Sequence, residues 1–542
     1  MKNEKILKRL NELTSSYSFI YILVSIVITD FCGTIDELFL KNVREHLNDK
    51  EFSFLVGLWL KNLKKDNLIE EEKLEAIYDE VYKLMDSLHL TFMSDFKFDS
   101  NDKTDIFDKF SKGSLLQETI IYAGTGAYDN QYKKLSTQKY KYDEKWILEN
   151  KGFSINCIES FYDNLKSKLQ TKLNDRKFLK KLKSNEALLD LFCLTKLEIT
   201  KKNTDFENLF NCLITDVSDK NNIEFNDLGD FNIFSAQPII KISKDRYFIP
   251  SAFAVSEALY ESPFYWMLND SKYKKIALKN RGDIAEELTA NMLETVFEKS
   301  NIYQNVLINK TKNETATDID VLAIHKERAI IFQIKSKKLT SLSKQGDLES
   351  IKDDFKKAVQ DTFEQGLKSK SCLLNYENFK FKDDELVGKI SKIKEYNIVT
   401  IVLDDYPGIS HQVHILLGKK SNILPVSINI FDLEILLKYL RKPDEFIDYI
   451  SKRVSFSKYY KADNEMCYLG FNLKKGLNKY DADYIVLDES WAQLIDKTYY
   501  KEVYREKIQD FSKRKIGRND SCFCRSGLKY KKCHGKRQNN FG

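Results

Sequence analysis

The chain of 542 residues is long enough for about two to four domains, each with a sizeable core. With 42% hydrophobic and 31% charged residues, it has the composition of a soluble globular protein. The 87 Lys and Arg residues against 81 Asp and Glu residues give a net charge of only +6. This excludes a global positive field, so any nucleic-acid-binding surface must be local.

The cysteines and the amino terminus indicate the compartment. Of nine cysteines, three lie close together near the carboxy terminus and six are scattered singly. They do not form a disulfide framework, and a reducing cytoplasm is expected. The first residues are charged and lack a small-residue cleavage site after an apolar core, so no signal peptide is expected. The apolar stretch from Phe19 to Ile28 is too short to span a bilayer and predicts a buried helix, so we expect no membrane contact.

Residues 1–227 predict a largely helical amino-terminal domain, because apolar residues recur there at intervals of three and four. Its many Tyr and Phe residues fit a packed core better than a base-stacking surface. Sensing, oligomerisation and substrate capping all fit this domain. In residues 228–275, two short strands across a Ser-Lys-Asp turn and a following helix predict a connector to the next domain.

The next segment predicts a helix in RGDIAEEL, a strand in NIYQNVLINK and a hairpin that turns at HKER. Because alternate side chains of a strand share a face, Asp318 and Asp320 point one way and should face Gln333 and Lys335 across the hairpin. Two acids opposite an amide and a lysine are unusual for a purely structural sheet. The residues between them are expected to supply the buried face: Ile319, Val321, Ile330, Phe332 and Ile334.

Residues 276–452 are predicted to form one α/β domain around this hairpin. A long helix is expected from Gly346, a buried strand in NIVTIVLDD and a closing helix in FDLEILLKYL. Asp404 and Asp405, at the end of that strand, are expected to be solvated. His411 and His414 lack a third ligand nearby and are assigned no metal. Residues 453–515 are assigned to a connector region.

Residues 516–537 have the spacing of a zinc site. Cys522 and Cys524 are followed, after eight residues, by Cys533 and His534. Three thiolates and one imidazole complete a tetrahedral Zn²⁺ shell, and they leave no position for a reacting water, so this zinc is expected to be structural. From residue 513 to 537 the tail carries ten Lys or Arg residues and one acid, a density that suits phosphates or an acidic protein surface.

Two parts of the chain resemble known families. The string IGRNDSCFCRSGLKYKKCHG resembles the SEC-C motif, with CFCRSG in place of the usual CPCGSG. The order of GDIAE, TDIDVL and QIK resembles the PD-(D/E)XK nuclease superfamily over about residues 276–452. The resemblance implies an α/β fold with a restriction-endonuclease-like α/β/α core, a mainly α-helical amino-terminal region and a small carboxy-terminal zinc knuckle.

The nuclease resemblance implies roles for four residues. Glu286, Asp320 and Gln333 would hold a catalytic Mg²⁺, with Mn²⁺ as the alternative, and Lys335 would orient the attacking water or stabilise the transition state. Asp318 is a weaker candidate. Gln333 replaces the second acid of the pattern and offers a carbonyl oxygen but no charge. Gln333→Glu, which restores that acid at nearly unchanged volume, should therefore preserve or strengthen metal binding.

We therefore expect a cytoplasmic, Mg²⁺-dependent nuclease, an endonuclease rather than an exonuclease, that favours DNA over RNA. A role in defence against phage or foreign DNA follows from resemblance alone. Two alternatives stay open: a catalytically inactive adaptor that binds nucleic acid or protein, and an RNA-directed nuclease that acts at the translation machinery. A protein partner for the tail and a homo-oligomer are both compatible with the sequence.

Overall fold

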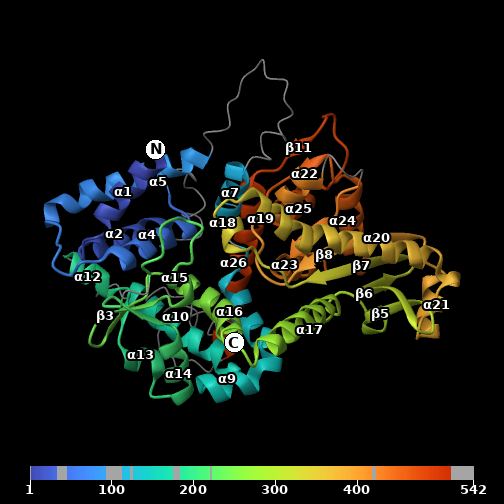
Figure 1. Ribbon diagram of the computed structural model, residues 1–542, viewed down its shortest axis with the longest axis horizontal. Coiled ribbons are helices and arrows are strands. Elements are labelled where there is room, and N and C mark those ends of the chain that lie inside the picture. Colours follow the sequence, from blue (N-terminus) through green and yellow to red (C-terminus); the bar gives the residue numbers. More distant parts are fainter. Residues whose placement is uncertain are drawn as a thin grey trace, which may run out of the picture.

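The structure is a computed structural model, shown in Figure 1, and it describes residues 2–32, 46–92, 113–122, 126–174, 184–219, 222–417 and 423–513. The amino-terminal helices lie on one side of the molecule and the largest sheet on the other (Figure 1). None of the described helices combines the length and the apolar character needed to cross a bilayer.

The amino-terminal region is mainly helical, as predicted. Its longer helices are α1 (Lys2–Leu13), α2 (Phe19–Ile26), α4 (Asp49–Asn62), α5 (Leu74–Phe92), α7 (Gly113–Tyr122), α8 (Asp129–Lys139), α9 (Glu144–Lys151) and α10 (Ile158–Asn174). Shorter helices follow: α12 (Asn185–Asp190), α13 (Lys196–Thr200), α14 (Thr204–Cys212) and α15 (Ile233–Ala236). The predicted buried helix at Phe19 is confirmed, because α2 packs with α1, α4 and α5 in one apolar core.

A small four-stranded sheet closes this region. Its strands are β1 (Cys193–Leu194), β2 (Ile214–Asp216), β3 (Ile239–Ser243) and β4 (Arg246–Phe248), in the order β1-β4-β3-β2. Strands β3 and β4 form the predicted hairpin across the Ser-Lys-Asp turn. Helix α16 (Ala252–Leu268) follows, as expected, and leads into α17 (Lys274–Leu293).

The second sheet has five strands: β5 (Ile302–Thr311), β6 (Glu314–His325), β7 (Arg328–Lys335), β8 (Glu395–Val402) and β9 (Val426–Asn429). They lie in sequence order; β5, β6 and β7 are antiparallel, whereas β7, β8 and β9 are parallel. The hairpin turns between His325 and Arg328, as predicted. Parallel strands need helical crossovers, and these cover the sheet.

Both faces of this sheet are buried. After β7 the chain forms α18 (Ser341–Lys344), α19 (Leu348–Phe355), α20 (Asp361–Leu374), α21 (Asp384–Ile390), α22 (Ile409–Leu417), α23 (Ile430–Tyr439) and α24 (Pro443–Ser455), with a π-helical turn η7 (Lys356–Gln360) between α19 and α20. One apolar core joins the sheet to α17, α23 and α24, and another joins it to α20 and α21. The predicted α/β fold is therefore confirmed.

One expectation about the hairpin is wrong. Ile319 and Val321 do not share a buried face, because Ile319 packs in the core beneath α20 with Leu322, whereas Val321 packs beneath α17. The alternation of side chains between the two faces of β6 is broken between Ile319 and Val321. The regular pairing of β6 with β7 ends at this point, with Val321 opposite Phe332.

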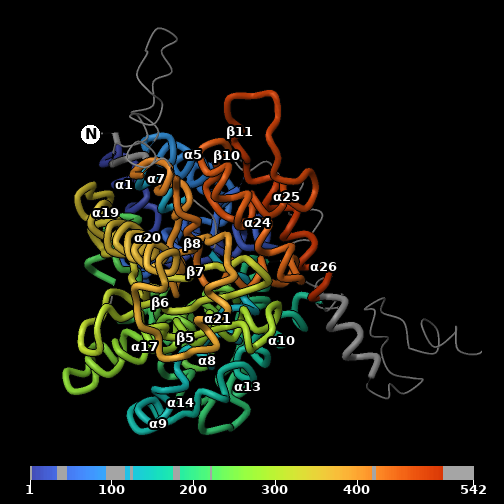
Figure 2. Tube along the Cα trace, turned by 90° about the vertical axis from the view of Figure 1, so that its right-hand side faces the viewer, coloured from blue at the N-terminus to red at the C-terminus, as the bar shows by residue number. Residues whose placement is uncertain are grey.

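Residues 453–513 share the core of the large sheet. They form β10 (Tyr460–Lys461), α25 (Glu465–Lys475), β11 (Ile485–Val486) and α26 (Glu489–Lys513). Tyr468 and Ile495 of these helices join the core that contains β7 and β8, as does Tyr132 of α8. In Figure 2, α25 and β11 lie at the opposite end of the molecule from α9 and α14.

A buried ion cluster joins the helical region to the end of β8. Asp404 is 1% exposed; its Oδ1 lies 2.7 Å from Lys139 Nζ of α8, and its Oδ2 pairs with Arg281 of α17. Lys338 Nζ is 3.9 Å from the same Oδ2 and pairs with Glu261. The expectation that Asp404 is solvated is therefore wrong, because cations from distant parts of the chain cover it.

Candidate active site

Helix α17 brings Glu286 to the large sheet. The helix packs on the sheet through Ile284, Ala285 and Leu288, which leaves Glu286 partly exposed beside the strands. The pKa of Glu286 is raised to about 7, first by burial and then by the carboxylates of Asp320, Asp283 and Asp318, whereas Lys335 acts to lower it. Helix α17 packs against β6 and β7, the strands that carry Asp318, Asp320 and Lys335, and the charges of these residues act on Glu286 from there.

Strands β6 and β7 separate at the predicted site. Their regular pairing runs from His325 and Arg328 to Val321 and Phe332. Beyond that point, two side chains bond to backbone groups across the opening. Asp320 Oδ2 accepts a hydrogen bond of 2.6 Å from the Ile334 amide, and Gln333 Nε2 donates one of 2.9 Å to the Asp318 carbonyl oxygen. The opening therefore stays polar within a buried sheet.

Asp320 is more buried than Glu286, the other acid predicted to bind the metal. It is 8% exposed, and its pKa is raised to about 6. Burial is the main cause and Asp318 adds to it, while the hydrogen bond from the Ile334 amide and the charge of Lys335 partly offset it. A carboxyl group whose pKa is raised in this way gains most when a cation approaches, because the cation replaces the lost hydration.

Gln333 presents an unsatisfied oxygen. Its side chain is 0% exposed, and its Oε1 has no hydrogen-bond partner among the described residues. Its Nε2 contacts the Asp318 carbonyl oxygen and, at 3.4 Å, Ser369 Oγ of α20. A carbonyl oxygen only accepts, so the amide nitrogen must face it and Oε1 must point elsewhere. A buried oxygen without a partner is costly unless a ligand completes it.

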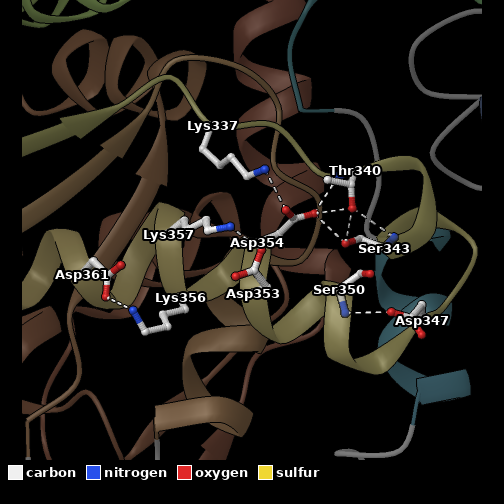
Figure 3. Close-up of polar contacts among 10 residues, drawn as sticks. All are labelled: Lys337, Thr340, Ser343, Asp347, Ser350, Asp353, Asp354, Lys356, Lys357 and Asp361. Carbon is white, nitrogen blue, oxygen red and sulfur yellow. Dashed lines mark hydrogen bonds and ion pairs between the residues drawn. The ribbon is translucent and has the colours of Figure 1, made fainter.

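Lys335 ends β7, where it pairs in register with Val402 of β8. It is partly exposed, and it lowers the pKa of both Glu286 and Asp320. The segment after it is anchored to α19 by Asp354, as Figure 3 shows. This buried carboxylate accepts hydrogen bonds from Thr340 N at 2.6 Å and from Ser343 Oγ at 2.5 Å, and Lys337 Nζ lies 2.8 Å away. Burial opposes ionisation of Asp354, but these partners together lower its pKa.

Two residues of the site were not predicted from the sequence. Gln365 Nε2 of α20 donates a hydrogen bond of 2.8 Å to Asp318 Oδ1, and Ser369 Oγ donates one of 2.9 Å to the Asp318 carbonyl oxygen. They are four residues apart on one helix and therefore lie on one face. The only signal in the sequence is this polar pair on the buried side of the long helix predicted from Gly346.

The oxygen donors fit a hard divalent cation. Among the described residues, no set of three His, Cys, Asp or Glu side chains converges closely enough to hold a metal ion. Mg²⁺ usually takes one or two carboxylates and completes its shell with waters and substrate phosphates. Two carboxylates and the unpartnered Oε1 of Gln333 are compatible with such an incomplete protein shell. The predicted zinc ligands Cys522, Cys524, Cys533 and His534 lie outside the described residues.

Comparison with known families gives two matches. Residues 281–398 match the nuclease-related domain, NERD, and residues 518–536 match the SEC-C motif. The first match runs from α17 into β8 and therefore contains all four predicted site residues of the sheet. No curated protein and no solved structure matches the chain significantly. The chain thus carries a nuclease-related domain followed by a SEC-C motif, as the sequence predicted.

Proposed function

We propose that the protein is a metal-dependent nuclease that hydrolyses phosphodiester bonds, with DNA as the favoured substrate. The observation that carries this proposal is the opening between β6 and β7. Asp320 with a pKa raised to about 6, Glu286 with a pKa raised to about 7 and the unpartnered Oε1 of Gln333 surround it, together with Lys335. The opening lies within the part of the chain that matches the nuclease-related domain.

The four site residues divide into three proposed metal ligands and one positively charged residue, Lys335. Asp320, Glu286 and Gln333 Oε1 are the ligands that we assign to Mg²⁺ or Mn²⁺, either directly or through water. Bound there, the cation would stabilise the additional negative charge of the phosphate and lower the pKa of a water. Three carboxylates, counting Asp318, repel one another, so a divalent cation relieves a repulsion that the protein itself leaves in place.

Lys335 is the positively charged side chain that the protein itself contributes to the proposed site. We assign it to the attacking water or to a phosphate oxygen, where its ammonium group would stabilise negative charge that grows during attack. The Asp354 anchor supports this role by fixing the segment that follows Lys335.

The carboxy-terminal motif is assigned a binding role. Cys522, Cys524, Cys533 and His534 are proposed to hold a structural Zn²⁺, and the basic tail is proposed to recruit the enzyme to nucleic acid or to an acidic protein. Endonuclease action, defence against phage or foreign DNA and a cytoplasmic location complete the proposal. These rest on the combination of a nuclease-related domain with a SEC-C motif.

Incubation of the purified protein with supercoiled plasmid, linear duplex and structured RNA tests the proposal. Each substrate is supplied with Mg²⁺ or with EDTA, and an Asp320→Asn preparation is the matched control. We expect plasmid to be nicked or linearised only with Mg²⁺ and only by the wild-type protein. Preferential cleavage of RNA would support an RNA-directed nuclease instead. Binding of any substrate without cleavage under all conditions would contradict nuclease activity and support an inactive adaptor.

A further inference from the structure

The opening between β6 and β7 requires an amide at position 333. Asp318 lies beyond the last regular residue pair of the β6–β7 ladder, and Gln333 Nε2 donates to its carbonyl oxygen at 2.9 Å. A carboxylate at this position would set an acceptor against an acceptor in a site that is 0% exposed. On this geometry Gln333→Glu should weaken the site, which is the opposite of what charge alone suggests.

Helix α20 holds the same carbonyl group from the other side. Ser369, which is 0% exposed, donates from Oγ to the Asp318 carbonyl oxygen at 2.9 Å and lies 3.4 Å from Gln333 Nε2. The helix approaches closely because residue 366 is glycine; a Cβ there would lie 2.6 Å from Ile398 Cγ2 and 3.6 Å from Gln333 Cγ. Ser369 is therefore fixed against both partners.

The Asp318 side chain is held by the same helix. Gln365 Nε2 donates to Asp318 Oδ1 at 2.8 Å. Asp318 acts electrostatically on both Glu286 and Asp320, so its position influences the charge of the whole site. Gln365 is the only partner that the structure gives to this carboxylate among the described residues, and it fixes one of the two oxygens.

We propose that Ser369 and Gln365 are positioning residues of the metal site. Together with Gln333 and Asp318 they form what we call the amide clamp. Within the clamp, Ser369 and Gln365 do not touch the cation; they hold Gln333 and Asp318 so that Gln333 Oε1 and the Asp318 carboxylate can face it. The inference rests on the proposed function, because it assumes a cation at the β6–β7 opening. It adds that α20, and not the hairpin alone, determines the geometry of the ligands.

Direct metal binding tests the amide clamp without turnover. Mn²⁺ is titrated into full-length protein and the free ion is measured by electron paramagnetic resonance, with Asp320→Asn defining the background. We expect Ser369→Ala and Gln365→Met each to weaken Mn²⁺ binding about threefold to tenfold, the range of one hydrogen bond. Two controls on the same helical segment should bind as the wild type does: Ser371→Ala, which is exposed, and Gln360→Met, whose amide bonds only Glu364 in this structure.

A double-mutant cycle separates positioning from general packing. In a Gln333→Met background there is no amide to orient, so Ser369→Ala should cost clearly less Mn²⁺ affinity than it does in the wild type, and only through its own bond to the Asp318 carbonyl oxygen. Melting of each metal-free variant shows whether it is folded, and the partly exposed Gln365→Met keeps the test valid if Ser369→Ala fails to fold. Wild-type binding by both clamp variants would overturn the inference but leave the proposed function standing. Absence of Mn²⁺ binding by the wild type would instead overturn the proposed function.

Discussion

Two buried carboxylates of the large sheet, one within β6 and one just after β8, differ in their partners. Asp404 follows β8, is 1% exposed and has a cationic partner on each oxygen, Lys139 on one and Arg281 on the other. Asp320 of β6 is 8% exposed, and the hydrogen bond that it accepts comes from a neutral backbone amide, that of Ile334. Burial alone therefore does not distinguish a structural acid from a candidate ligand. The partners do, because paired charge is already stabilised and unpaired charge still gains from a cation.

The largest expected effect separates the two acids by stability. Asp404→Ala leaves Lys139 and Arg281 buried without their partner, which should cost about 3–5 kcal/mol of the free energy of unfolding. Chemical denaturation followed by circular dichroism measures this loss. Asp353→Ala, which removes an exposed pair with Lys357, should change the same quantity by only about 0–1 kcal/mol. Equal losses from both variants would remove the distinction between Asp404 and an ordinary surface acid.

The same comparison predicts a loss of activity without a loss of stability at Asp320. Asp320→Asn retains an acceptor for the Ile334 amide but removes the charge, so the protein should stay folded. Cleavage should fall by about 10²–10³-fold, or roughly 3–4 kcal/mol of barrier, as when one electrostatic stabiliser of a transition state is removed. Rates under single-turnover conditions provide the measurement. A folded variant that cleaves at the wild-type rate would mean that Asp320 is not part of the machinery.

The raised pKa of Asp320 predicts how pH affects the metal-free protein. Because the folded pKa is about 6 and the ordinary value is 3.8, ionisation is harder in the folded state. Below about pH 4 both states are protonated and nothing is lost; as pH rises through 6 the folded state loses up to about 3 kcal/mol relative to the unfolded state.

Mg²⁺ should reverse this loss, since the cation binds only the ionised carboxylates. The increase in melting temperature on adding Mg²⁺ is therefore expected to be larger at pH 7.5 than at pH 5. Asp320→Asn should lack most of that difference. An equal Mg²⁺ effect at both pH values in the wild type would argue against raised carboxyl pKa values at the site.

The smallest effect on the core is expected from the tail. Deleting the residues after Lys515 should remove a single zinc ion, measured by elemental analysis, because the four proposed ligands lie close together in the sequence, between residues 522 and 534. The truncated protein should melt at the temperature of the full-length protein and cleave short duplexes at the same rate, within experimental error. Its recruitment to the target should weaken. Collapse of the truncated protein, or no zinc in the intact chain, would contradict a modular zinc knuckle.

The sequence predicts the frame of the site well, because local patterns determine it. Hydrophobic periodicity predicts the helix that carries Glu286 and the strand that carries both Gln333 and Lys335. Turn residues predict the hairpin, which turns after His325. The fold class follows from the same order of elements. These features need no knowledge of contacts between distant residues.

What the sequence does not predict depends on long-range contacts. Asp404 is buried by Lys139, which lies 265 residues earlier, so local pattern suggested a solvated acid. Ile319 changes its core because the ladder opens, and no residue type in TDIDVL signals that opening. Gln365 and Ser369 reach Asp318 across 47 and 51 residues, and on the helix alone they look like ordinary polar positions.

Cleavage of supercoiled plasmid by wild-type protein and by Lys335→Met, side by side in Mg²⁺, tests the central claim most directly. The claim is that the β6–β7 opening is the phosphodiesterase site. We predict nicked or linear product from the wild type, no product in EDTA, and a rate at least about a hundredfold lower for the folded Lys335→Met protein. Cleavage by Lys335→Met at the wild-type rate, or equal cleavage in EDTA, would contradict it.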